Sequence, residues 1–175
     1  MENKLLDLTL KRRSTRRYTG ESVDDDVINE ILNVALTAPS SWGGHPIEFV
    51  VVKNKDMIRK IASCKAMGAG PLNQADVCIV VMADTSVCEL WIEDASVTST
   101  YILLAAEQYD IGACWIHIRN RAGKIKTADE EIRELLNVPN KYKVLNCVAL
   151  GKKGEIKRQR SRNDLHKANV HYETY

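Results

Sequence analysis

The sequence lacks the cysteine patterns that hold metal ions or disulfides. Its five cysteines are an odd number, and no two of them form a Cys-x-x-Cys pair. This spacing argues against a structural zinc site and against a disulfide framework. Cys78, Cys114 and Cys147 lie in apolar, strand-like runs, where a thiol is usually a small core side chain.

Long apolar segments and a strong excess of one charge are missing as well. No uninterrupted apolar run approaches membrane-spanning length, and the N-terminal residues show no apolar signal-peptide core. We therefore expect a cytoplasmic protein without a membrane partner. The net charge of only +2 argues against a general nucleic-acid binder. A length of 175 residues with an ordinary soluble composition predicts one domain, over residues 1–175.

The known signatures of side-chain catalysis are also absent. No Ser-His-Asp set, His-Glu-x-x-His motif, Walker loop or paired-carboxylate signature stands out. Glu93 and Asp94 are adjacent on an expected helix and do not face each other, so we interpret them as a cap or a structural pair. Cys114 has no obvious His/Asn constellation, which argues against a nucleophilic thiol. These absences fit a protein whose chemistry resides in a cofactor.

What is present is an alternation of helix and strand patterns, typical of an α+β fold. Helices are expected over residues 3–13, 23–38, 56–64, 91–108 and 128–136, and strands over residues 48–52, 77–82, 111–116 and 144–150. Ser22 is expected to cap the second helix. The run 77–82 is apolar on both faces, which predicts a central strand. No strand is followed by Gly-x-Gly-x-x-Gly, so a dinucleotide-binding doubly wound fold is not expected.

Two features of the helices and the C-terminus complete this outline. Small residues on the apolar face of 91–108 permit close packing, so we expect this segment to be the core helix. Residues 152–175 are polar and basic and then aromatic. We expect them to form an arm that needs another surface to order it.

The first candidate site is the basic stretch Arg12-Arg13-Ser14-Thr15-Arg16-Arg17 at the end of the first expected helix. Arginine forks and a serine hydroxyl supply charge and directed donors together, which suits a phosphate monoester. The alternative is a solvated basic helix end, which is favourable to the helix dipole. A second basic cluster, Lys157 to Arg162, is most simply solvated when taken alone. If it folds back beside Arg12 to Arg16, the two clusters form one anion pocket.

Two further stretches have the composition of ligand-binding segments. Residues 38–46 join a helix to a strand, and Gly43-Gly44 lets the backbone approach a ligand closely. An ordinary turn explains this stretch equally well. Residues 112–121 form an apolar strand that becomes abruptly polar, and such strand ends often border ligand sites. His117 at this end is either a hydrogen-bond or proton donor or a structural histidine.

These stretches, in this order, resemble the FMN-dependent nitroreductase family over essentially the whole chain. The matching motifs are Arg-Arg-Ser-x-Arg at Arg12 to Arg16, Ala-Pro-Ser-Ser before a proline at Ala38 to Pro46, a Gly-x-x-Cys-Trp-like strand that is one residue shorter here at Gly112 to Trp115, Leu-Leu-x-x-Pro running into Ala-Leu-Gly at Leu135 to Gly151, and the basic stretch followed by His-Tyr-Glu at Lys157 to Glu173. Each motif alone is weak, but their order and spacing together are fairly specific.

The resemblance implies a nitroreductase-like α/β sandwich, with a central, mostly antiparallel sheet flanked by helices. It also implies an obligate homodimer that exchanges C-terminal arms and holds two FMN molecules at its interface. By the same resemblance, the FMN phosphate and ribityl chain are held by Arg12, Arg13, Ser14, Arg16, Arg158 and Arg160. The flavin is contacted from the other subunit by Pro39, Ser40, Ser41 and Gly43, and bordered by Trp115, Ile116 and His117.

The chain departs from the family pattern at three positions, which leaves the substrate open. Gly43 stands where an asparagine is common, Ile47 where an aromatic residue is common, and His117 where a glycine is common. His117 is therefore either a helper of the flavin chemistry or a replacement that packs.

The implied activity is transfer of two electrons from NADH or NADPH through flavin N5 to an acceptor, by a ping-pong mechanism. Nitroaromatics, quinones and free flavin are the candidate acceptors. A different interpretation is an FMN carrier or sensor without general reductase activity. Also open are a specialised activity, such as dehalogenation or flavin fragmentation, and a phosphate-binding or dimerisation module without flavin.

Overall fold

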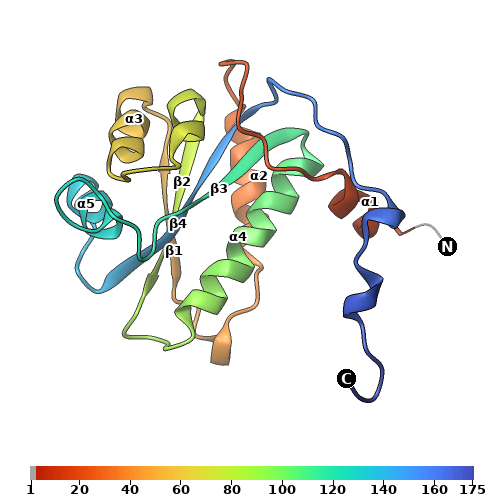
Figure 1. Ribbon diagram of the computed structural model, residues 1–175. Helices are drawn as coiled ribbons and strands as arrows, with labels where there is room; N and C mark the ends of the chain where they lie inside the picture. Colours follow the sequence, from red (N-terminus) through yellow and green to blue (C-terminus); the bar gives the residue numbers. More distant parts are fainter. Residues whose placement is uncertain (1–2) are drawn as a thin grey trace.

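A computed structural model describes residues 3–175 of the chain, so the first two residues of the expected domain lie outside the description. Figure 1 shows a twisted sheet with helices on both faces. The strands are β1 (Ile47–Val52), β2 (Val77–Asp84), β3 (Ile111–His117) and β4 (Tyr142–Lys152). The helices are α1 (Lys4–Lys11), α2 (Asp25–Leu36), α3 (Lys55–Ser63), α4 (Trp91–Gln108) and α5 (Ala128–Leu135). Short 3-10 turns are η1 (Ser41–Gly43), η2 (Gly70–Gln74), η3 (Arg162–Asp164) and η4 (Lys167–Asn169).

The strands lie in the order β1-β2-β4-β3, and every neighbouring pair is antiparallel. All eight residues of β2 are buried, which confirms the central strand predicted from its two apolar faces. β3 is an edge strand. Its neighbour β4 carries a bulge in its pairing with β2. Leu145 is the extra residue, because Val81 pairs with Asn146 while Met82 pairs with Val144. The Leu145 carbonyl accepts the amides of Ile118 and Arg119 and so fixes the chain where β3 ends.

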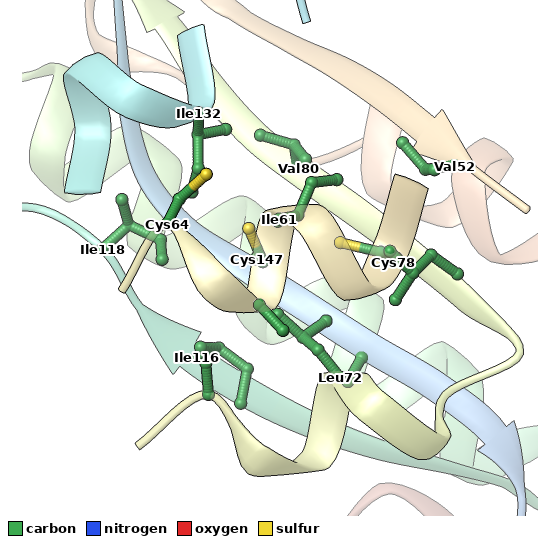
Figure 2. Packing of buried hydrophobic residues seen from close by; sticks show 14 of the residues in the cluster. Val52, Ile61, Cys64, Leu72, Cys78, Val80, Ile116, Ile118, Ile132 and Cys147 are labelled. Atoms are coloured by element: carbon green, nitrogen blue, oxygen red, sulfur yellow. The ribbon is translucent and has the colours of Figure 1, made fainter. Parts of the chain in front are cut away.

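Two apolar layers cover the sheet. One face packs against α3, η2 and α5, and Figure 2 shows its cluster, with Cys78 and Cys147 among branched aliphatic side chains. The other face packs against α2 and α4. Helix α4 lies close to the sheet because its buried positions include Ala95, Ser99 and Ala106. This confirms the expected core helix. All five cysteines are free and buried.

Helices α1 and α2 are both shorter than the sequence predicts, and α2 ends at Leu36 rather than Ala38. Val23 does not begin α2, because its side chain is buried in the core and its amide donates to the Asp76 carboxylate at 2.8 Å. Ser22 is therefore not the N-cap; Asp24 takes that position without a side-chain cap bond. Helix α1 ends at Lys11 rather than Arg13, because the chain turns extended at Arg12 and pairs with β3.

After β4 the chain forms an arm with two short 3-10 turns, which Figure 1 shows running past α1 and away from the sheet. Tyr172 and Tyr175 on this arm are almost fully exposed. Within residues 3–175, no helix is long and apolar enough to cross a membrane. The same residues contain no group of three or more His, Cys, Asp or Glu side chains arranged to hold a metal ion.

Asp84, at the end of β2, makes stability depend on pH. Hydrogen bonds from the Lys141 ammonium and from Ser86 lower the pKa of Asp84 to about 2. A carboxyl whose folded pKa is lowered stabilises the fold above its unfolded pKa of about 4 and loses this contribution as pH falls toward 2. We expect Asp84→Asn to lower the melting temperature at pH 7, with the difference from the native protein shrinking between pH 4 and pH 2.

Thermal unfolding followed by circular dichroism at pH 7, 4, 3 and 2 measures this difference. Asp56→Asn is the control, because the Asp56 side chain is 81% exposed and its surface ion pair contributes little. An Asp84→Asn deficit that stays constant down to pH 2 would contradict the assignment.

Candidate functional site

The N-terminal basic segment lies along the free edge of β3. Ser14 pairs with Ala113 as a short parallel bridge, and the Thr15 amide donates to the Ala113 carbonyl at 2.9 Å. Gly112 permits this approach, because a Cβ there would lie 2.7 Å from the Thr15 methyl carbon. The segment that carries the arginines is therefore fixed by the sheet and not by α1.

The second basic stretch folds back beside the first, as the sequence analysis anticipated. The Arg160 amide donates to the Leu10 carbonyl at 3.0 Å, and the Arg13 guanidinium donates to the Arg158 carbonyl. The Lys157 ammonium donates to the Ser14 carbonyl at 2.6 Å. Backbone carbonyls of each stretch thus hold the cations of the other, and the two clusters form one basic surface.

Arg12 is the electrostatic centre of this surface. Its side chain is partly buried, and the pKa of its guanidinium is lowered by burial first and then by the charge of Arg160. No group within residues 3–175 accepts a hydrogen bond from it, and Glu107 is the acid whose charge favours its ionised form. A partly desolvated cation beside a second cation is costly unless an anion joins them. The arrangement is therefore suited to a phosphate group.

The other predicted phosphate ligands differ in availability. Arg16 is exposed, and its amide donates to the Glu155 carboxylate at 2.6 Å. The Arg158 guanidinium is engaged by the Asp164 carboxylate at 2.7 Å. A bound anion would have to compete with that carboxylate, whereas Arg12 is unengaged.

Behind the basic surface lies a cavity of about 300 Å³ whose floor is an ion-pair network. The Lys153 ammonium lies 2.8 Å from Glu107 and 2.9 Å from Asp110, and Lys11 bridges the same two carboxylates at 3.6 and 3.5 Å. The Glu107 side chain is only 3% exposed. This network holds the end of α1 and the end of β4 to the C-terminal end of α4.

The 38–46 loop lies at the other end of α4. The Asp94 carboxylate, in the first turn of α4, accepts the Ser41 amide at 2.9 Å and the Ser41 hydroxyl at 2.8 Å. The Ser40 hydroxyl accepts the His45 amide at 3.0 Å. Gly43 has a φ of +67°, which glycine adopts without strain, and Trp42 also has a positive φ and is 88% exposed. The loop therefore presents an exposed, sharply turned backbone on a fixed base.

The end of β3 contributes side chains of two kinds. Trp115 and His117 lie on the same face of the strand, with ring centroids 6.3 Å apart and nearly parallel planes. Ile116 points to the opposite face and is buried in the α3/α5 cluster, so only its backbone is open to a ligand. Cys114 is buried too, and burial raises the pKa of its thiol. A thiol of this kind is a poor nucleophile at neutral pH.

The surroundings of His117 disfavour its charged form. Burial lowers the pKa of its imidazole, and the charges of Arg121, Lys65 and Arg119 lower it further. Lys65 reaches this area because the Ala66 amide donates to the Ala122 carbonyl at 3.0 Å. Sequence reasoning missed Lys65, since nothing in its local pattern sets it apart, and it classed Asp94 only as a cap or structural pair.

One chain does not bring all the predicted site residues together. The arginine cluster and the 38–46 loop are held at opposite ends of α4, through Glu107 and Asp94. These two residues are on the order of 20 Å apart along the axis, at about 1.5 Å per residue. Figure 1 shows α1 and the arm on one side of the molecule, away from the loop that precedes β1.

Comparison with known proteins places the chain among flavin-linked reductases. A family model described as "Nitroreductase family" matches residues 9–77 and 65–152. A protein of Archaeoglobus fulgidus named "Putative NADH dehydrogenase/NAD(P)H nitroreductase" is 33% identical over 150 residues, which cover 83% of each chain. The FMN reductase [NAD(P)H] of Bacillus subtilis is 24% identical over 194 residues, covering 99% of this chain and 75% of that protein.

The solved structures agree. An FMN-dependent nitroreductase from Clostridium difficile R20291 superimposes with a TM-score of 0.94 at 38% sequence identity, covering 97% of this chain and 99% of that one. The family model spans most of the chain, and the fold extends over nearly all of it. The chain belongs to the nitroreductase family.

Proposed function

We propose that the protein is an FMN-dependent oxidoreductase that uses NADH or NADPH, built as a single FMN-binding domain over residues 1–175. The observation that carries this is Arg12, a partly buried guanidinium without a partner in the described residues, beside Arg160. A phosphate monoester such as that of FMN supplies the missing charge. The names of the Clostridium difficile and Bacillus subtilis relatives support the same cofactor.

The donor set of the chain fits each part of FMN. Arg12, Arg13, Ser14 and Arg16, with Arg158 and Arg160, would hold the phosphate and the ribityl chain. The open half of the β3 edge, at Trp115, Ile116 and His117, offers backbone groups to the ring. When bound, FMN supplies two-electron chemistry, namely hydride uptake from NADH or NADPH at N5 and delivery of two electrons to an acceptor.

The remaining predicted contacts come from a second copy. Pro39, Ser40, Ser41 and Gly43 are too far from the arginine cluster of their own chain to serve the same cofactor. We therefore infer a homodimer with two sites at its interface, in which each loop completes the site of its partner. The exposed arm with Tyr172 and Tyr175 is consistent with an arm exchanged between copies.

His117 is better suited to positioning than to proton donation. Because burial and neighbouring cations lower the pKa of the imidazole, they disfavour the protonated form that would give a proton to an acceptor. It stacks beside Trp115 and would limit access to the ring. Small flat acceptors, such as nitroaromatics, quinones or free flavin, fit an open cofactor face that reductant and acceptor use in turn.

The first test is the visible absorption spectrum of the purified protein before and after anaerobic addition of NADH or NADPH. We expect flavin bands that bleach on addition of one or both reductants and return on addition of menadione. With menadione as acceptor, double-reciprocal plots should be parallel, since donor and acceptor use the same face. Flavin bands that persist would favour a carrier or sensor. A protein that stays colourless after soaking with FMN would refute the proposed function.

The second test removes the unpartnered cation. Arg12→Ala should weaken FMN binding by about 10- to 100-fold, the equivalent of charge-assisted hydrogen bonds of about 1.5–3 kcal/mol. Titration of the apoprotein followed by flavin fluorescence measures the dissociation constant. Arg59→Ala is the control, because Arg59 lies on α3 in a surface pair with Asp56. Equal affinities for the two variants would contradict a phosphate site at Arg12.

The third test asks whether each site uses two chains. Gly43→Val should distort the loop, because valine strongly disfavours a φ of +67°. Differently tagged copies carrying Arg12→Ala and Gly43→Val are refolded together, and the mixed dimer is purified. If the loop acts across the interface, one site per mixed dimer is intact and binds about one FMN tightly. If both segments act within one chain, the mixed dimer has no intact site.

A further inference from the structure

We propose that Asp94 is a positioning residue for the cofactor, because it holds the 38–46 loop in its binding conformation. This inference rests on the proposed function, since it assumes that the loop contacts FMN. It gives Asp94 a role other than that of a cap or structural pair with Glu93.

The geometry sets Asp94 apart from an ordinary helix cap. A carboxylate in the first turn of a helix usually binds the free amides of that helix. The Asp94 Oδ1 atom instead accepts both the amide and the hydroxyl of Ser41, a residue 53 positions earlier in the chain. Asp94 is 4% exposed, so these bonds are shielded from water. They tie the loop to α4, which packs along the length of the sheet.

The loop needs such a tie because its backbone is strained. Trp42 and His45 both adopt positive φ angles, at +57° and +46°, which side chains other than glycine disfavour. Trp42 is almost fully exposed, so packing of its side chain does not offset the strain. The other anchor is at the far end of the loop, where the Asp84 amide donates to the Pro46 carbonyl at 2.9 Å. Asp94 holds the start of the loop, through Ser41.

The second oxygen of the carboxylate points to the same conclusion. Asp94 Oδ2 is buried and has no hydrogen-bond partner within residues 3–175. An unpaired carboxylate oxygen in the interior costs stability. Stability alone therefore does not account for the burial of this oxygen. The role of Asp94 in holding the loop does account for it.

The experiment compares three variants by two measurements. The dissociation constant for FMN is obtained by fluorescence titration of the apoprotein, and the melting temperature of the same apoprotein is recorded. Asp94→Ala removes the acceptor, and Asp94→Asn keeps an oxygen that accepts the Ser41 amide and hydroxyl. Asp76→Asn is the matched control, because Asp76 is 5% exposed, accepts the Val23 amide at 2.8 Å, and precedes β2 at the end opposite to the loop.

We expect Asp94→Ala to raise the dissociation constant at least about 10-fold and Asp94→Asn to stay within about threefold of the native value. Asp76→Asn should lower the melting temperature without changing FMN affinity. The proposal is overturned if Asp94→Ala binds FMN as tightly as the native protein. It is also overturned if Asp76→Asn loses affinity in the same proportion to its loss of stability.

A measurement without cofactor keeps the proposal testable if Asp94→Ala folds poorly. Hydrogen exchange of the native and Asp94→Asn apoproteins should show that the Ser41 amide is protected in both. In the Asp94→Ala apoprotein, the amides of residues 40–44 should exchange faster, under conditions in which the sheet stays closed. A Ser41 amide that exchanges freely in the native protein overturns the proposal that Asp94 holds the loop. Failure of the native protein to bind FMN refutes the proposed function, whatever exchange shows.

Discussion

Helix α4 controls the geometry of the candidate site, because a buried carboxylate near each end binds a different segment of the chain. Asp94 binds the 38–46 loop through Ser41, and Glu107 binds Lys153 and Lys11 beside the arginine cluster. Small residues let α4 lie close against the sheet, so both ends are fixed relative to β3 and β4. The distance between the two halves of the site is therefore set by the length of one helix.

This constraint explains why the site has the form of two half-sites. The arginine cluster contains Arg12, a partly buried guanidinium without a partner in the described residues, and the loop presents exposed backbone with positive φ angles. In the proposed homodimer, a ligand with a phosphate at one end and a flat ring at the other would join the arginine cluster of one copy to the loop of the other. Chemistry supplied by a cofactor agrees with the buried Cys114 thiol, whose pKa is raised, and with His117, whose pKa is lowered by burial and by neighbouring cations.

Much of the fold follows from local sequence. The two-sided apolar pattern of residues 77–82 predicted the central strand, because all of its positions are buried. The small residues of 91–108 predicted the core helix, because they lie on the face of α4 that packs against the sheet. The boundaries of α1 and α2 did not follow, since they depend on distant partners. Asp76 takes the Val23 amide, and Ala113 takes the Thr15 amide; neither partner is visible from the residues next to the boundary.

The candidate site was also predicted only in part from the sequence. Residue types and their order determined the family, the class of cofactor and the arginine, loop and strand-end motifs, because such motifs are contiguous in sequence. The tertiary structure decided that the two basic stretches meet, that Arg158 is engaged by Asp164 while Arg12 has no partner among residues 3–175, and that Asp94 holds a loop rather than capping its own helix. The meeting of the two basic stretches and the hold of Asp94 on the loop depend on hydrogen bonds between residues at least 53 positions apart, which form only when the sheet and α4 bring those segments together. Arg158 and Asp164 are near neighbours in sequence, and their pairing depends on how the arm turns.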